Sequence, residues 1–149
     1  MLKIYIEKVN HGKKFSKPQY ETSFSSGVDL KAGINKTIKL KVSEIILIPA
    51  GIKVIIPQGY EGQVRSRSGL ALNHGISVLN SPGTIDSDYR GEIGIVLINL
   101  GKSVFKIDPG MRIAQLVFTP VIKCIIEETK IDSFETKRNR KGFGSTGLN

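Results

Sequence analysis

Short runs of alternating or β-branched apolar residues, separated by turns rich in proline and glycine, extend along most of the chain. Alternation of apolar and polar residues favours a strand, and so does a short apolar run that ends at a turn. The pattern predicts strands over residues 3–8, 37–42, 45–48, 52–56, 60–65, 92–100 and 112–119. Because short strands between frequent turns are typical of sandwiches and barrels, the sequence predicts an all-β fold.

The segment SGLALNHG at residues 68–75 differs from this pattern and predicts one short helix. Ser68 is of a type that caps helix N-termini, and Gly75 stands where a C-terminal glycine is expected. We expect Leu70 and Leu72 to pack inward from this helix.

The last part of the chain, from Ser133 onward, is polar, basic and rich in glycine, with Phe134 and Phe143 as its only aromatic residues. Such a composition buries little surface, so by itself it predicts a flexible tail. The sequence shows no internal repeat and no interdomain linker. We therefore expect one domain over residues 1–132, followed by a C-terminal arm over residues 133–149.

The length of 149 residues suits one domain, and no apolar run is long enough to span a bilayer. Charges at Lys3, Glu7 and Lys8 interrupt the apolar stretch that a signal peptide would need at the start of the chain. Both observations predict a soluble cytoplasmic protein with no membrane partner. Because Cys124 is the only cysteine and the histidines number two, neither an intrachain disulfide nor a dedicated transition-metal site is expected.

The formal net charge of +9 favours anionic partners, which include nucleic acids, anionic lipids and phosphorylated small molecules. The lysines are scattered, however, so a solvated basic surface explains the charge equally well. The densest basic cluster is Lys137, Arg138, Arg140 and Lys141.

Two polar stretches could bind a phosphorylated ligand. Arg65 and Arg67 precede the expected helix start at Ser68, where free backbone N–H groups, guanidinium groups and a hydroxyl would suit a phosphate. The alternative is ordinary helix capping beside a surface arginine. Asp29, in the stretch SGVDL, follows a glycine and on local grounds is a turn aspartate.

The stretch from Asn80 to Tyr89 holds the second group of candidates. Pro82 and Gly83 suit the centre of a type II turn, which would fold residues 78–81 back on residues 84–88 as a hairpin. The mouth of a hairpin offers backbone donors and acceptors to a planar base, and Asn80 adds an amide. Asp86 and Asp88 would share one face of a strand, which fits a Mg²⁺ pair, a single general base acting on water, or a solvent-exposed face.

The stretch GFGSTG at residues 142–147 matches G-x-G-x-x-G, but no strand–helix unit surrounds it, so we do not expect a dinucleotide-binding fold. No P-loop sequence occurs either. What remains is a glycine-rich arm that carries Arg138, Phe143, Ser145 and Thr146. Such an arm can become ordered over a polyphosphate and stack Phe143 on a base.

Five stretches, taken in order, resemble the five motifs of the homotrimeric dUTPase family. They are SGVDLKA, RSRSGLA, GTIDSDYRGE, RIAQL and RNRKGFGSTG, and they extend from about Ser26 to Gly147. The resemblance implies a distorted jelly-roll β-barrel with one short helix and an extended C-terminal arm. It also implies a homotrimer whose active sites are each assembled from three subunits, and hydrolysis of dUTP to dUMP and pyrophosphate with Mg²⁺.

The resemblance also implies roles for single residues. Asp86 takes the place of the catalytic aspartate, which orients and deprotonates the water that attacks the α-phosphorus. Tyr89 takes the place of the ring under the deoxyribose that rejects a 2′-hydroxyl, Asn80 belongs to the uracil pocket, and Asp29 holds Mg²⁺ through water. The implied substrate-binding residues are Arg67, Ser68, Gly69, Asn80, Tyr89, Gln115, Arg138, Phe143, Gly144, Ser145 and Thr146.

The chain departs from the family pattern at Ser26, where alanine is usual, and at Asn139 and Lys141, where glycines are more common. Lys141 would add a phosphate contact. Two other functions remain to be compared with dUTP hydrolysis: deamination of dCTP on the same fold, and salt-sensitive nucleic-acid binding without turnover. The stretch Ile85–Tyr89 favours the dUTPase over the deaminase, and no specific nucleic-acid binding is expected.

Overall fold

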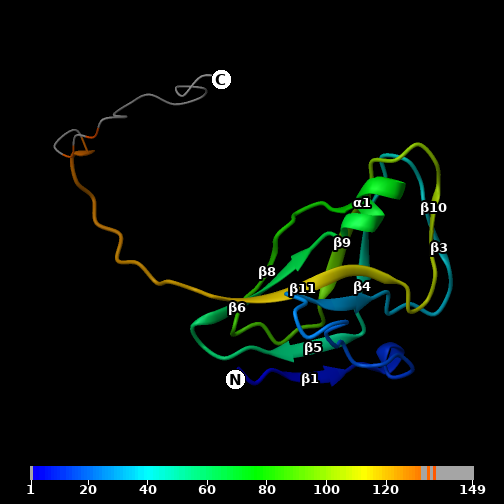
Figure 1. Cartoon of the computed structure of the whole chain (residues 1–149), viewed down its shortest axis with the longest axis horizontal. Helices are drawn as coiled ribbons and strands as arrows, with labels where there is room; N and C mark the ends of the chain where they lie inside the picture. Colours follow the sequence, from blue (N-terminus) through cyan, green and yellow to red (C-terminus); the bar gives the residue numbers. More distant parts are fainter. Residues whose placement is uncertain (1, 132–133, 135, 137–149) are drawn as a thin grey trace.

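The computed structural model of the chain describes residues 2–131, 134 and 136 (Figure 1). The described elements are, in order, β1 (Tyr5–Lys8), η1 (Asn10–Gly12), β2 (Val28–Lys31), β3 (Ile38–Leu40), β4 (Ile45–Pro49), β5 (Ile52–Ile55), β6 (Tyr60–Arg65), α1 (Ser68–His74), β7 (Ile76–Val78), β8 (Gly83–Ile85), β9 (Gly94–Asn99), β10 (Phe105–Ile107) and β11 (Arg112–Pro120). Strands with one short helix confirm the all-β prediction. Arg138 and the other predicted arm residues from position 138 onward lie outside the described residues.

The strands form antiparallel sheets around a common core. The largest sheet has the order β2-β11-β6-β8, and a second has the order β4-β9-β7. Two further strand pairs, β1-β5 and β10-β3, lie at different sides of the body, and the chain after β11 runs away from it (Figure 1). The described sheets do not close into one barrel, which is the architecture of a distorted jelly roll.

Alternation along the strands directs one face of each sheet to the core. In β9, for example, Ile95, Leu97 and Asn99 are fully buried while the residues between them are half-buried. Each isoleucine or leucine removed from water in this way contributes about 1.5–3 kcal/mol of transfer free energy. The core is therefore built from β-branched and leucine side chains of strands that are distant in sequence.

Asn99 is the only polar side chain that is fully buried among the described residues. Its Nδ2 atom donates to the carbonyl oxygens of Leu40, at 3.0 Å, and Ser103, at 2.9 Å. Its Oδ1 atom accepts from the backbone N–H of Gly101 at 2.9 Å. The amide thereby satisfies three backbone groups and joins the end of β9 to β3 and to the turn before β10.

The predicted helix forms, but two details of the prediction are wrong. The N-cap is Arg67 rather than Ser68, and no side chain caps the helix. Arg67 keeps an extended backbone while its guanidinium pairs with Asp29, and the helix begins at Ser68, one residue earlier than an N-cap at Ser68 would place it. Leu70 packs against the core as predicted, whereas Leu72 is 86% exposed. Gly75 ends the helix in the left-handed conformation, with φ of 69°, as predicted.

The predicted hairpin over residues 78–88 is wrong. The Ser81–Pro82 peptide bond is cis, and Gly83 is the first residue of β8 rather than part of a type II turn. β7 pairs with β9, whereas β8 pairs with β6, so the two strands belong to different sheets. Asp86 follows the end of β8, and the argument that placed it with Asp88 on one face of a strand does not apply.

Within the described residues, no helix has both the length and the apolar character that are needed to cross a membrane.

Candidate active site

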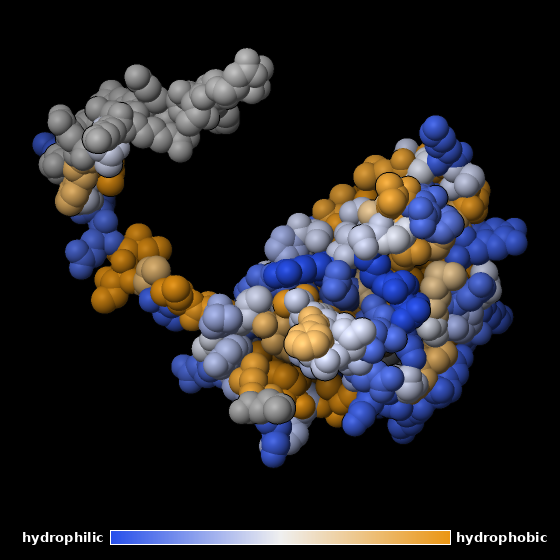
Figure 2. Space-filling view, in the orientation of Figure 1, coloured by the Kyte–Doolittle hydropathy of each residue, from blue (hydrophilic) through white to orange (hydrophobic). Residues whose placement is uncertain are grey.

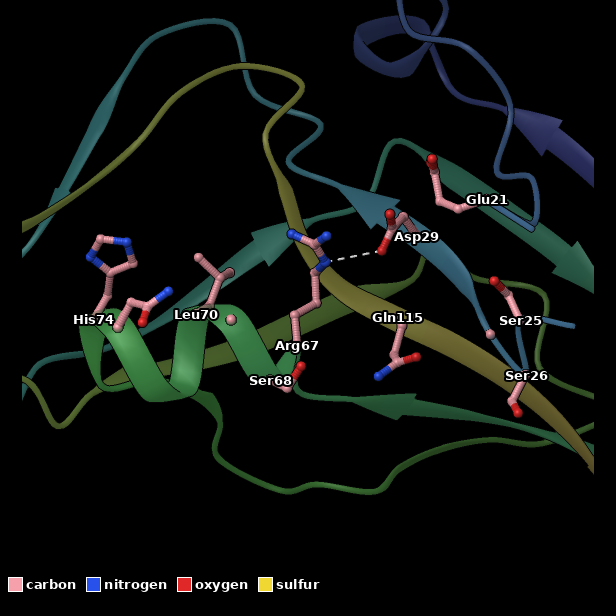
Figure 3. A pocket seen from close by; sticks show the side chains of 12 residues that line it. Glu21, Ser25, Ser26, Asp29, Arg67, Ser68, Leu70, His74 and Gln115 are labelled. Carbon is pink, nitrogen blue, oxygen red and sulfur yellow. Dashed lines mark ion pairs between the residues drawn. The ribbon is translucent and has the colours of Figure 1, made fainter.

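A polar pocket of about 620 Å³ opens between the start of α1, the middle of β11 and the chain that leads into β2 (Figure 3). Asp29 lines it from β2, Arg67, Ser68 and Gly69 from the start of α1, and Gln115 from β11. These residues meet because β11 lies between β2 and β6, with Gln115 opposite both Asp29 and Arg65. Sheet order thus brings three of the predicted motifs together.

Asp29 is the electrostatic centre of this pocket. Its Oδ1 atom lies 3.0 Å from Nε of Arg67, and the two side chains point toward one another in Figure 3. Its Oδ2 atom lies 3.1 Å from Nη1 of Arg112, which also lies 3.1 Å from Oε1 of Glu21. The Asp29 side chain is only 14% exposed, so solvent screens these pairs less than it screens surface pairs. Asp29 therefore holds Arg67 in place at the mouth of the pocket.

The Gln115 side chain is fixed on the other wall. Its Nε2 atom donates to the carbonyl oxygen of Ser66 at 3.1 Å. A Cβ atom on Gly27 would lie 2.8 Å from Gln115 Oε1, so the glycine leaves room for this amide. Ser68 and Gly69 are exposed, and a Cβ atom at Gly69 would meet nothing within 4 Å. A ligand can therefore approach the backbone at the start of α1 closely.

The pocket suits an anion. Arginine, serine and glutamine side chains and the first backbone N–H groups of α1 can all donate hydrogen bonds to phosphate oxygens. A magnesium ion fits here only in company with such a ligand. No group of three or more histidine, cysteine, aspartate or glutamate residues in the described part of the chain could hold a metal. One carboxylate, Asp29, together with substrate phosphates and water is a donor set that Mg²⁺ accepts.

Asp86 lies outside this pocket. It is exposed and lines a separate hollow of about 650 Å³, together with Asp88 and Arg90. The backbone turns here, since the Tyr89 N–H donates to the Asp86 carbonyl oxygen at 3.1 Å. Arg90 Nη1 donates to the carbonyl oxygens of Ser87, at 2.7 Å, and of Tyr89, at 2.9 Å. The turn that presents Asp86 is thus closed by its own hydrogen bonds.

Asn80 and Tyr89 also lie outside the pocket that contains Asp29. Asn80 is exposed in the connection between β7 and β8. The ring of Tyr89 folds back over Gly91, where a Cβ atom would lie 2.3 Å from the tyrosine hydroxyl. That hydroxyl donates to the carbonyl oxygen of Glu92 at 2.9 Å. Among the described residues of one chain, the predicted site residues therefore divide into a group that lines the Asp29 pocket and a group, Asn80, Asp86 and Tyr89, that lies outside it.

Three residues that sequence reasoning did not single out take part in these arrangements. Arg112 was quoted in a motif without a role, and it binds Asp29 across the β2–β11 pair. Glu92 and His11 form a hydrogen bond across 81 positions of sequence, with 2.7 Å between Oε1 and Nε2. Local patterns contain no signal for such contacts, because they depend on strand order and register.

Comparisons with known proteins agree with one another. The sequence model of the dUTPase family matches residues 13–147. A deoxyuridine 5′-triphosphate nucleotidohydrolase of Wolbachia pipientis subsp. Culex pipiens (strain wPip) is 52% identical over 149 residues, which cover 98% of this chain and 96% of that protein.

Solved structures share the fold. A mutant dUTPase of Staphylococcus bacteriophage 80alpha, solved with dUpNHpp, aligns with a TM-score of 0.87 and 24% identity over 98% of this chain and 99% of that one. A mutant dUTPase of phage phi11 of S. aureus, described with a structural Mg(II) ion, aligns with a TM-score of 0.76 and 21% identity over 86% of this chain and 97% of that one.

Proposed function

Because the chain belongs to the dUTPase family and is a dUTP diphosphatase, we propose that it hydrolyses dUTP to dUMP and pyrophosphate through water activated by Asp86. The observation that carries this proposal is the pocket in which Asp29, Arg67 and Gln115 converge beside the exposed start of α1. In the cytoplasm such an activity keeps uracil out of DNA and supplies dUMP for thymidylate synthesis.

The triphosphate occupies the polar pocket. Arg67, Ser68, Gly69 and Gln115 donate hydrogen bonds to its oxygens, and Asp29 keeps the Arg67 guanidinium oriented through the 3.0 Å contact. Phosphoryl transfer depends mainly on positioning and on neutralisation of charge, so a side chain that is oriented in advance lowers the barrier. A magnesium ion, held by the phosphates and through water by Asp29, would supply further positive charge.

The nucleoside is recognised by the second group of residues. Asn80 and its connection bind uracil, the Tyr89 ring lies under the deoxyribose and excludes a 2′-hydroxyl, and Asp86 takes the proton of the attacking water. Asp86 is exposed, so a water molecule can reach its carboxylate oxygens, and a carboxylate can serve as the general base without a histidine.

A homotrimer unites the two groups. Since Asp86 and Tyr89 lie outside the Asp29 pocket of their own chain, we propose that each site combines the pocket of one subunit with the Asp86 turn of another. Exposed apolar side chains support association: Ile122, Ile125 and Ile126, on the segment after β11, are 86%, 89% and 95% exposed. Figure 2 shows apolar side chains along this segment, outside the body of the molecule. The arm at residues 133–149 then closes over the nucleotide.

The test is pyrophosphate release from dUTP, dTTP, dCTP and UTP by the wild-type protein and by Asp86→Asn. We expect turnover of dUTP to exceed that of the other three, and Asp86→Asn to lower kcat about a hundredfold or more, as loss of a general base does. Equal turnover of all four nucleotides, or an Asp86→Asn variant at the full rate, would refute the proposal. Ammonia released from dCTP would indicate the deaminase instead.

A further inference from the structure

The Glu92 carboxylate is fixed by two donors from distant parts of the chain. Its Oε1 atom lies 2.7 Å from Nε2 of His11, on η1, and 2.8 Å from the backbone N of Gly51, between β4 and β5. A carboxylate only accepts hydrogen bonds, so Nε2 of His11 carries the proton that it donates. The two side chains are 32% and 27% exposed, which leaves this contact partly shielded from water.

The main chain of Glu92 fixes the Tyr89 ring. The Tyr89 hydroxyl donates to the Glu92 carbonyl oxygen at 2.9 Å, and the ring lies directly over Gly91. Ile93, the next residue, is fully buried, and its N–H donates to the Ile52 carbonyl oxygen at 2.9 Å. The ring therefore lies on a short piece of backbone that is anchored at one end by Ile93 and through the Glu92 side chain by His11.

His11 itself has a fixed position. A Cβ atom on Gly12 would meet the Gly51 carbonyl oxygen at 2.0 Å, so η1 packs directly against the turn between β4 and β5. The Val9 N–H donates to that same carbonyl at 3.0 Å, and the Gly12 N–H donates to the Val9 carbonyl at 2.9 Å. The donor that holds Glu92 thus belongs to a rigid support, which is what precise positioning of a binding residue requires.

We propose that His11 is a positioning residue for substrate selection, which acts through Glu92 on the Tyr89 ring. The hydrogen bond from His11 fixes the Glu92 side chain, the Glu92 backbone fixes the tyrosine hydroxyl, and the height of the ring decides whether a 2′-hydroxyl fits under the sugar. His11 touches neither the substrate nor Asp86. The inference rests on the proposed function, because it takes Tyr89 as the ring that meets the deoxyribose.

The sharpest test compares His11→Asn with His11→Gln. Both side chains are neutral amides, but only the glutamine nitrogen reaches the place that Nε2 of histidine occupies. Measurements of kcat and KM for dUTP and UTP, with Tm as a check of stability, give the ratio of kcat/KM for the two nucleotides. We expect His11→Asn to lower this dUTP:UTP ratio about tenfold, with KM for dUTP raised more than kcat is lowered, and His11→Gln to restore most of it.

Glu7→Gln is the matched control. It breaks a more exposed pair, in which Lys53 Nζ lies 3.7 Å from Glu7 Oε1 across β1 and β5, without touching the Glu92 backbone. We expect the dUTP:UTP ratio of kcat/KM in Glu7→Gln to equal that of the wild-type protein. A double-mutant cycle adds Tyr89→Phe, which removes the hydroxyl that binds Glu92. If the two changes act through one path, His11→Asn combined with Tyr89→Phe lowers the ratio no further than the more damaging single change.

Three results would overturn the inference. They are a lower Tm of His11→Asn with an unchanged dUTP:UTP ratio, an equal loss of ratio in His11→Gln and His11→Asn, and fully additive losses in the cycle. Failure of the proposed function is distinguishable from these, because a wild-type protein without preference for dUTP over UTP would refute it before any variant is compared.

Discussion

The Oδ1 atom of Asp29 lies 3.0 Å from Nε of Arg67, and this ion pair joins β2 to the N-cap residue of α1. Arg67 also donates from Nη1 to the carbonyl oxygen of Arg112, at 3.2 Å. The guanidinium is therefore held by β2 and by β11 at once. The orientation of the guanidinium is set before a ligand arrives, so binding of a triphosphate loses less side-chain entropy.

Replacement of Asp29 tests this orientation. In Asp29→Asn, the size of the side chain is kept but its charge is lost, so Arg67 loses its ion pair and Arg112 keeps only the one with Glu21. We expect kcat/KM for dUTP to fall at least about tenfold, with a small change in Tm because the arginines are partly exposed. Steady-state kinetics at fixed magnesium concentration measures the effect.

Arg67→Lys is the companion variant, because lysine keeps the positive charge but loses the planar set of donors. A wild-type kcat/KM in both variants would mean that the pair serves neither binding nor catalysis.

Gly91→Ala tests the position of the Tyr89 ring by a steric route. A Cβ atom at this position would lie 2.3 Å from the tyrosine hydroxyl and 2.5 Å from Cζ, so the ring must leave its place over Gly91. We expect the dUTP:UTP ratio of kcat/KM to fall at least about tenfold, since displacement of a contacting ring by about 1 Å has effects of this size. If the ratio stays at its wild-type value, the ring does not select the sugar from this position.

The fold was predictable where local chemistry decides it. The strand expected over residues 60–65 coincides with β6, and the end of α1 at Gly75 follows from the glycine itself. The hairpin over residues 78–88 failed because β7 and β8 find their partners in β9 and β6, a choice that depends on the assembled core. The prediction that Leu72 packs inward failed for a related reason. Which face of a short helix meets the core is determined by the strands that the helix packs against.

The sequence allowed prediction of which residues belong to the candidate site, but not of where in the fold they meet. The motifs identified Asp29, Arg67 and Gln115, but their convergence follows from the order β2-β11-β6, which no local pattern contains. The contact between His11 and Glu92 spans 81 positions and was absent from the prediction for the same reason. Only the resemblance to a trimeric family implied that Asp86 would lie apart from the pocket that contains Asp29.

Asn99→Leu tests the buried amide that joins β9, β3 and the turn before β10. Leucine fills a similar volume but leaves the Leu40 and Ser103 carbonyls and the Gly101 N–H without their partner. Each buried group that loses its hydrogen bond costs about 1–3 kcal/mol, so we expect a loss of at least about 3 kcal/mol in the free energy of unfolding.

Denaturant unfolding at one protein concentration measures this loss, because the stability of an oligomer depends on concentration. Asn35→Ala is the control: its Oδ1 atom accepts one exposed hydrogen bond, at 3.0 Å from Lys14 Nζ, and its removal should change stability by no more than about 0.5 kcal/mol. If the two variants lose equal free energy of unfolding, the buried hydrogen bonds of Asn99 contribute no more to stability than the exposed one of Asn35.

Mixed assemblies test whether the two groups of site residues meet between chains. Arg67→Ala damages the pocket, and Asp86→Asn removes the base from the separate turn, so each variant alone should be nearly inactive. If a site takes its pocket from one chain and Asp86 from another, an equal mixture that is denatured and refolded together forms some sites with both parts intact. Random assembly predicts recovery of about a quarter of the wild-type activity.

The matched control mixes Asp29→Ala with Arg67→Ala. Both changes lie in the pocket of one chain, so no mixture restores an intact pocket, and we expect no recovery beyond the two parents. Native mass spectrometry counts the chains in each assembly and verifies that hybrids have formed. If hybrids form and the Arg67→Ala and Asp86→Asn mixture stays as inactive as its parents, the two groups must act within one chain. The arrangement in which Asp86 completes a neighbour's pocket would then be wrong.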